Sequence, residues 1–181
     1  GVMISKNTLN LAGVAPDAKL YASAFVAGGP GGEEILKSIQ HIASRNGGDV
    51  RAINHSYGRG LDILESLDGS SYFTKGLDWS ASAHDVLHVV AGNETGPAAP
   101  LPTDNYNGMT IAASKRDVDG TFSIVADLNT YDEDADGSRT SIDLIAPGDN
   151  IELTSLGTIS LTDSGTSFAA PHVTGTVALL Q

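Results

Sequence analysis

Short apolar segments alternate with helical patterns through the first half of the chain. Residues 19–26 have the composition of a β-strand, and residues 33–48 repeat apolar side chains at helical spacing before a Gly-Gly pair. Two further apolar segments, 49–58 and 85–93, enclose a polar and aromatic stretch. This order of strand, helix, strand, helix, strand predicts an α/β fold. We expect a parallel sheet covered by helices, with ligands gathering at the carboxyl ends of its strands.

The second half of the chain is looser and ends on another helical segment. Residues 109–114 are apolar, residues 142–148 and 151–155 are short strand candidates, and a helix is expected to begin near Ser167. The sequence shows neither an internal repeat nor a low-complexity linker. We therefore expect one globular domain over residues 1–181.

Charge and residue usage exclude several classes of protein. The 181 residues carry a formal net charge of −12, which argues against nucleic-acid binding because phosphate contacts need clustered Lys and Arg. No apolar run approaches the roughly 18 residues that span a bilayer. The absence of cysteine removes thiolate nucleophiles, disulfides and cysteine-based zinc sites. Nucleophilic chemistry would have to use another side chain.

Residues 165–175, GTSFAAPHVTG, place a serine in the first turn of the last helix. If Thr166 or Gly165 caps this helix, free backbone N–H groups and the positive end of the helix dipole lie around Ser167. Pro171 weakens this turn because it lacks the N–H group that would bond the Ser167 carbonyl. A serine that attacks a carbonyl generates an oxyanion, which its own N–H group can bind. The alternative is a small-residue helix start packed under a sheet.

Asn93 follows the apolar run in VVAGNE, at the predicted end of a strand. Its side-chain amide is a candidate second donor to the same oxyanion. An asparagine in such a turn is also commonly a turn residue or a cap, so both interpretations stay open.

Five segments, in order along the chain, resemble the signature segments of the subtilisin-like serine proteases. They are GVAPDAKLYA, INHSYG, VVAGNE, DLIAPG and GTSFAAPHVTG. The resemblance spans nearly the whole chain. It implies a three-layer α/β fold, with a mostly parallel sheet and helices on both faces, incomplete at both ends. It also implies a serine endopeptidase that forms an acyl-enzyme on its serine.

The resemblance assigns roles to individual residues. Ser167 would be the nucleophile and Asn93 the oxyanion-hole amide. Residues 56–58 would form a rim that pairs with the substrate backbone, a glycine-rich stretch would form the opposite rim, and residues 91–92 would line the pocket for the residue before the cut. Tyr57 is a candidate pocket wall, with ordinary packing as the alternative. The substrate-binding residues implied are Ser56, Tyr57, Gly58, Ala91, Gly92, Gly28 and Gly29.

No histidine of this chain is an evident base for Ser167. At about 100° per residue, His172 lies about 140° away from Ser167 around a helix, too far to reach it. His84 and His88 have the i, i+4 spacing of a helical metal pair, but His88 falls in a predicted strand. His55, beside the first rim, is the one candidate near the site, and the resemblance does not make it the base.

The resemblance places the missing partners of the serine outside this chain. In the family, the triad Asp and His precede the first matched segment, and the His lies in an HGTxVAG motif. The opening residues GVMIS are similar to what directly follows that motif. We therefore expect both side chains, and the helices beyond Gln181, to lie outside residues 1–181. Because a serine hydroxyl is a weak nucleophile without a base, this chain alone is expected to be nearly inactive.

An acidic loop gives a second candidate site. In DEDADGSRTSID three aspartates alternate, a glycine follows, and a fourth aspartate comes eleven residues after the first, which is typical of a calcium loop. The closing residue is Asp rather than Glu and Arg139 replaces an apolar residue, so a solvated loop is the alternative. The resemblance adds a ligand of a second, incomplete calcium site near the N-terminus. The candidate ligands are Asp132, Asp134, Asp136, Asp143 and Asn7.

The sequence leaves three functions in competition. The first is an endopeptidase acting on protein or peptide substrates, with no cofactor required for its chemistry and structural calcium as an addition. The second is a pseudoprotease or peptide-binding module that keeps the groove without turnover, and the third is a calcium-stabilised structural domain. The resemblance further implies a secreted or extracytoplasmic location, and the remainder of the catalytic domain as a partner.

Overall fold

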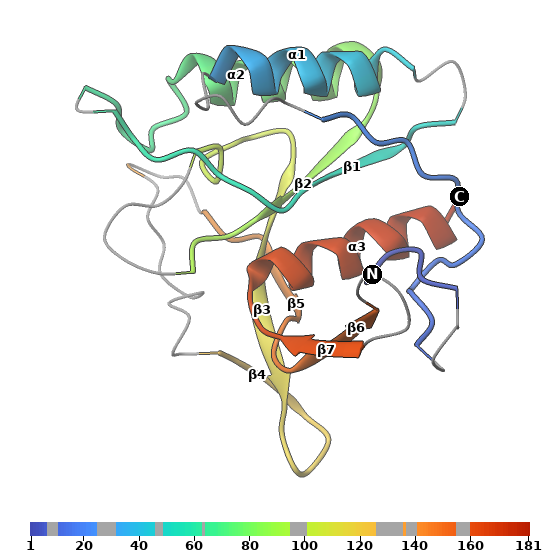
Figure 1. Cartoon of the computed structure of the whole chain (residues 1–181). Coiled ribbons are helices and arrows are strands. Elements are labelled where there is room, and N and C mark those ends of the chain that lie inside the picture. Colours follow the sequence, from blue (N-terminus) through green and yellow to red (C-terminus); the bar gives the residue numbers. More distant parts are fainter. Residues whose placement is uncertain are drawn as a thin grey trace.

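The sheet at the centre of the fold contains five strands (Figure 1). The computed structural model describes residues 1–6, 11–24, 32–45, 49–62, 64–94, 101–125, 136, 141–154 and 160–181. Within these ranges the sheet strands are β1 (Ala52–His55), β2 (Leu87–Ala91), β3 (Met109–Arg116), β4 (Phe122–Ile124) and β5 (Leu144–Pro147). β1 pairs with β2, β2 with β3 and β3 with β5, all in parallel, whereas β4 is antiparallel to β3. The predicted, mostly parallel sheet is confirmed.

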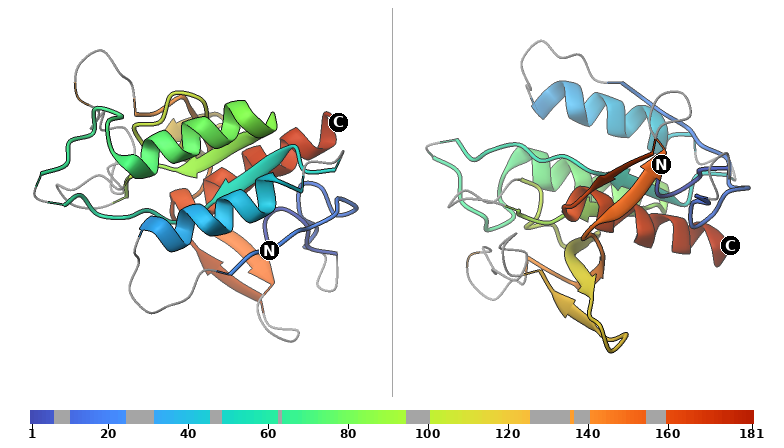
Figure 2. Two further views of the ribbon diagram at one scale, coloured as in Figure 1. Left: turned by 90° about the horizontal axis from the view of Figure 1, so that it is seen from above. Right: turned by 60° about the horizontal axis from the view of Figure 1, so that its bottom comes forward.

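Helices cover both faces of this sheet, as the three-layer prediction requires (Figures 1 and 2). α1 (Gly32–Ala43) and α2 (Tyr72–His84) lie side by side on one face, and α3 (Thr166–Leu179) crosses the other. No helix in the described ranges has the length and hydropathy of a membrane span.

The core divides between the two faces. Side chains of α1 and α2 enclose one cluster together with the loops beside them: Ile35, Ile39, Leu67, Phe73 and Leu101. Between the sheet and α3 lies a second cluster, in which small residues predominate on the helix: Val89, Ala91, Ile111, Ala113, Val125, Ala146, Ala169 and Ala170. Small side chains bring the helix close to the sheet.

The start of α3 rests directly on the carboxyl ends of β3 and β5. A Cβ atom on Gly148, just after β5, would lie 2.7 Å from the Ala113 Cβ and 2.8 Å from the Gly165 carbonyl oxygen, so a glycine is needed there. The Gly165 N–H also donates to the Gly148 carbonyl at 2.7 Å. An antiparallel hairpin of β6 (Ile151–Thr154) and β7 (Ser160–Asp163) precedes the helix.

One predicted strand is absent. Residues 19–24, the described part of the 19–26 segment, form no strand, although the other predicted strands and helices appear. In the described part of the chain, β1 pairs only with β2, so its other edge meets no neighbour. Leu20 and Tyr21 are accordingly 55% and 42% exposed. Residues 19–24 therefore have the composition of a strand but no adjacent strand with which to form hydrogen bonds in the described part of the chain.

Candidate active site

The candidate nucleophile lies in the first turn of α3. Gly165 is the N-cap, with φ 152° and ψ 162°, a backbone region essentially restricted to glycine, and as a glycine it has no side chain with which to cap the helix. This leaves the N–H groups of the first turn to other partners. Ser167 therefore stands where the backbone can bind negative charge, as the sequence predicted.

Pro171 lies inside α3 and has the consequence expected for its missing N–H group. The Ser167 carbonyl accepts a hydrogen bond from the Ser56 hydroxyl at 2.8 Å instead of from residue 171. The Ser167 hydroxyl in turn donates a longer bond, 3.4 Å, to the Ser56 carbonyl. These two bonds fix the predicted rim residue Ser56, just past the end of β1, against the serine.

The segment after β2 meets the same helix turn. The Thr166 hydroxyl lies 2.8 Å from the Gly92 carbonyl oxygen, and Gly92 donates its N–H to Ile111 at 2.9 Å. Asn93 follows directly and is buried, with 7% of its surface exposed. Residues 91–93 and Ser167 therefore lie on one side of the sheet, at the carboxyl ends of parallel strands. The catalytic role of Asn93 stays a prediction.

Glu94 is a site residue that the sequence analysis missed. Its Oε1 accepts a hydrogen bond from the Ser167 backbone N–H at 3.1 Å and lies 2.7 Å from the Thr166 hydroxyl. The preference of carboxylates for helix N-termini is the signal that points to it, since Glu94 adjoins Asn93 at a predicted strand end.

The rim that contains Tyr57 continues from Ser56 along the surface. The Tyr57 ring packs against the hydrophobic cluster enclosed by α1 and α2. Ordinary packing, the alternative to a pocket wall, therefore accounts for much of its position. Its hydroxyl lies 2.9 Å from His55 Nδ1, and burial raises the pKa of Tyr57. Gly58 is exposed. The opposite rim, with Gly28 and Gly29, lies outside the described residues.

All five histidines lie in the described part of the chain, and none of them hydrogen bonds to Ser167. His172 Nδ1 donates to the Phe168 carbonyl of its own helix at 2.9 Å, as expected for a structural histidine. His55 Nε2 and His88 Nδ1 share a hydrogen bond of 2.8 Å in the interior. In the described residues, therefore, no histidine is hydrogen bonded to Ser167.

The buried histidine pair predicts a loss of stability in acid. Burial, with a smaller contribution from His84, lowers the pKa of His88 to about 4, and burial also lowers the pKa of His55. Between pH 6.5 and 4 the unfolded chain therefore binds protons that the folded chain does not. We expect the free energy of unfolding to fall as the pH drops through this window, by about 3 kcal/mol for His88 alone.

Urea unfolding at pH 7 and pH 4.5 measures this effect. A His88→Gln variant should lose less stability on acidification than the parent chain or a His41→Gln control, because His41 is exposed. Equal losses in all three proteins would show that the buried pair does not control the acid response.

The structure describes two of the five candidate calcium ligands. Asp143 Oδ2 accepts a hydrogen bond from the Thr110 N–H at 2.7 Å, and Asp136 donates its own N–H to Leu67. Asp132, Asp134 and Asn7 lie outside the described residues. Among the residues that are described, no group of three or more His, Asp or Glu side chains could hold a metal ion. Calcium binding stays a prediction.

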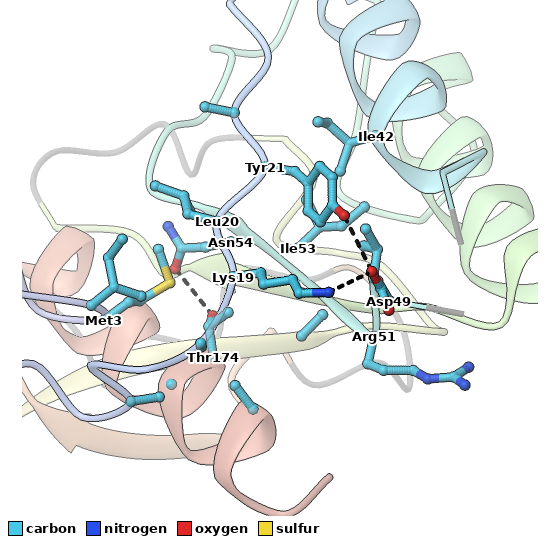
Figure 3. Close-up of a pocket in the computed structure, with 18 of the residues that line it drawn as sticks. Met3, Lys19, Leu20, Tyr21, Ile42, Asp49, Arg51, Ile53, Asn54 and Thr174 are labelled. Atoms are coloured by element: carbon cyan, nitrogen blue, oxygen red, sulfur yellow. Dashed lines mark hydrogen bonds and ion pairs between the residues drawn. The ribbon is translucent and has the colours of Figure 1, made fainter. Parts of the chain in front are cut away.

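A groove of about 460 Å³ runs along the free edge of β1, and we call it the β1 groove (Figure 3). Its walls include residues 18–23, β1 with its flanks, part of α1, the C-terminal half of α3 and a few residues near the N-terminus. Lys19 Nζ and the Tyr21 hydroxyl both bond Asp49 across one side of it, at 3.1 and 3.3 Å. Residues 19–23 line this groove together with β1, and they form no ladder with it.

Comparisons with known proteins agree with this geometry. The sequence model of the Subtilase family matches residues 1–181. Subtilisin Savinase from Lederbergia lenta is 28% identical over 176 residues, which are 97% of this chain and 58% of that protein. An alkaline protease from Alkalihalobacillus alcalophilus is also 28% identical over 97% of this chain, but over 41% of its own length. The chain thus spans about half the length of these curated relatives.

Solved structures show the same fold. Fervidolysin from Fervidobacterium pennivorans, a keratinolytic enzyme related to subtilisin, matches this chain with a TM-score of 0.73 and 26% sequence identity. The match covers 99% of this chain and 28% of the fervidolysin chain. Sphericase matches 99% of this chain and 60% of the sphericase chain, with a TM-score of 0.72 and 24% sequence identity. At this identity the match shows a shared fold and nothing further. With the family match over its whole length, the chain belongs to the subtilase family of serine proteases.

Proposed function

We propose that this chain carries the nucleophile and the oxyanion donors of a subtilisin-like serine endopeptidase. The observation that carries the proposal is the meeting of two distant segments, residue 56 and residues 92–94, with the start of α3. Ser56 bonds the carbonyl of Ser167, and Gly92 and Glu94 contact Thr166 and Ser167. Both segments follow the carboxyl ends of parallel strands, β1 and β2, where α/β folds place their ligands.

The proposed reaction is acyl transfer to Ser167. The Oγ atom adds to the carbonyl carbon of the scissile peptide while its proton passes to a base, and the carbonyl oxygen becomes an oxyanion. The Ser167 N–H and the Asn93 side-chain amide would bind that oxygen. Collapse breaks the C–N bond, the leaving amine takes the proton, and water then hydrolyses the acyl-enzyme by the same steps.

The base is proposed to come from residues outside this chain. The five histidines engage other partners, and the chain spans 41% and 58% of the two curated relatives described above. We propose that part of the remainder of the catalytic domain occupies the β1 groove, because an unpaired strand edge there can accept an extended segment. Residues 1–181 together with that remainder are called the complete catalytic domain below.

The chain alone is expected to cleave casein or a chromogenic peptide no faster than its Ser167→Ala variant, since neither has a base. Addition of the remaining part of the domain should raise hydrolysis by the parent chain but not by the variant. Strong hydrolysis by the parent chain alone, lost in the variant, would show that the base lies within residues 1–181.

Two further expectations accompany the proposal. The resemblance to subtilisin-like proteases leads us to propose an extracytoplasmic location, with protein or peptide substrates. Structural calcium at the acidic loop is proposed from the spacing of its aspartates.

A further inference from the structure

Glu94 places its carboxylate where the proposed reaction needs a free oxyanion position. Its Oε1 accepts the backbone N–H of Ser167 at 3.1 Å. A backbone amide has one proton to donate. While Glu94 holds that proton, the oxygen of a carbonyl attacked by Ser167 cannot accept it.

The surroundings of Glu94 stabilise this arrangement. Thr166 can donate its hydroxyl proton to Glu94 Oε1 at 2.7 Å or to the Gly92 carbonyl at 2.8 Å. A Cβ atom on Gly165 would lie 2.6 Å from Glu94 Oε1 and 3.1 Å from its carboxyl carbon, so only glycine leaves room for the side chain. The positive end of the α3 dipole favours a negative group at this place.

We infer that Glu94 closes the oxyanion position of the resting protein and that a substrate must displace it before Ser167 can react. The inference rests on the proposed function, since the position matters only if Ser167 attacks a carbonyl. Glu94 then acts as an autoinhibitory side chain, which competes with every ligand that needs the Ser167 N–H.

A peptide aldehyde tests this competition in the complete catalytic domain. Ser167 Oγ adds to the aldehyde carbon, the carbonyl π bond breaks, and the hydroxyl proton passes to the base. The former carbonyl oxygen becomes an oxyanion, to which the Ser167 N–H can donate a hydrogen bond. We expect the inhibition constant to fall about tenfold in Glu94→Ala, because a hydrogen bond to a charged group no longer has to be broken. Glu94→Gln keeps a neutral acceptor and should give a smaller fall, about threefold.

A matched control and a second readout complete the test. Glu152→Ala removes an exposed carboxylate from β6 and should leave the inhibition constant unchanged. In NMR spectra, the amide proton of Ser167 should move upfield in Glu94→Ala and stay in place in Glu152→Ala. If Glu94→Ala is unstable, Glu94→Gln carries both measurements.

The two possible failures are distinguishable. An unchanged inhibition constant and an unmoved Ser167 amide resonance in a Glu94 variant, in a domain that hydrolyses peptides, would overturn the role of Glu94 and leave the proposed function standing. Absence of hydrolysis by the correctly folded, unmutated domain would overturn the proposed function, and the role of Glu94 with it.

Discussion

Replacement of Ser167 by alanine in the complete catalytic domain is expected to lower kcat by about 10⁶-fold, the loss that removal of the nucleophile causes in subtilisin itself. The reason is that no other group can form the acyl-enzyme once the hydroxyl is gone. Within the described residues the Ser167 side chain makes one hydrogen bond, which is long at 3.4 Å, so the substitution should leave the fold intact. The measurement is steady-state hydrolysis of a chromogenic peptide.

Ser160→Ala is the matched control for this experiment. Ser160 lies exposed in β7, in the same part of the chain but away from the start of α3. We expect its kcat to equal that of the unmutated domain. If Ser167→Ala kept more than a few per cent of the activity with an unchanged melting temperature, another nucleophile would have to exist.

Replacement of Asn93 by alanine is expected to lower kcat by about 10²- to 10³-fold, the range found when one oxyanion donor is removed from subtilisin. KM should change little, because the oxyanion forms only after binding and the lost hydrogen bond belongs to the transition state. Separate determination of kcat and KM tests this assignment. A rise in KM at constant kcat would make Asn93 a ground-state binding or turn residue, the alternative that its sequence context allows.

Asn107→Ala is a suitable control for Asn93. Asn107 is also an asparagine, but it is exposed and bonds Asp78 and Ser82 far along the chain from the serine turn. Its replacement should change neither kcat nor KM. The melting temperature of the Asn93 variant must be measured too, since Asn93 is buried and its loss can act through stability.

The fold was predictable because strand and helix patterns fix the topology. Alternating segments in the first half require parallel strands, and parallel strands bring their carboxyl ends to one edge. That rule placed Asn93 at a strand end, and the resemblance to subtilisin-like proteases added Ser56 and Ser167 to the same site. The contacts of Ser56 and Gly92 with the start of α3 agree with this expectation. The effect of Pro171 was likewise local, since a missing N–H group is a property of one residue.

The predictions that failed or were missed depend on neighbours that sequence patterns do not specify. Residues 19–24 have strand composition, but a strand also needs a partner, and in the described residues this segment does not pair with β1. The hydrogen bond between His55 and His88 arises because β1 and β2 are adjacent, and their register places Ile53 beside His88. His55 lies two residues after Ile53 on the same face of β1, so its side chain reaches His88 diagonally. The position of Glu94 depends on how closely a loop approaches a helix. His55 and His88 are 33 residues apart in the sequence and Glu94 and Ser167 are 73 apart, and local sequence patterns do not predict contacts over such separations.

The most direct test of the account is active-site labelling of the complete catalytic domain with a fluorophosphonate, followed by peptide mapping. Attack on phosphorus requires a polarised serine hydroxyl, so we predict a single labelled residue, Ser167, and no labelling in Ser167→Ala. Labelling at another serine, or no labelling of a correctly folded domain, would contradict the claim that Ser167 is a catalytic nucleophile.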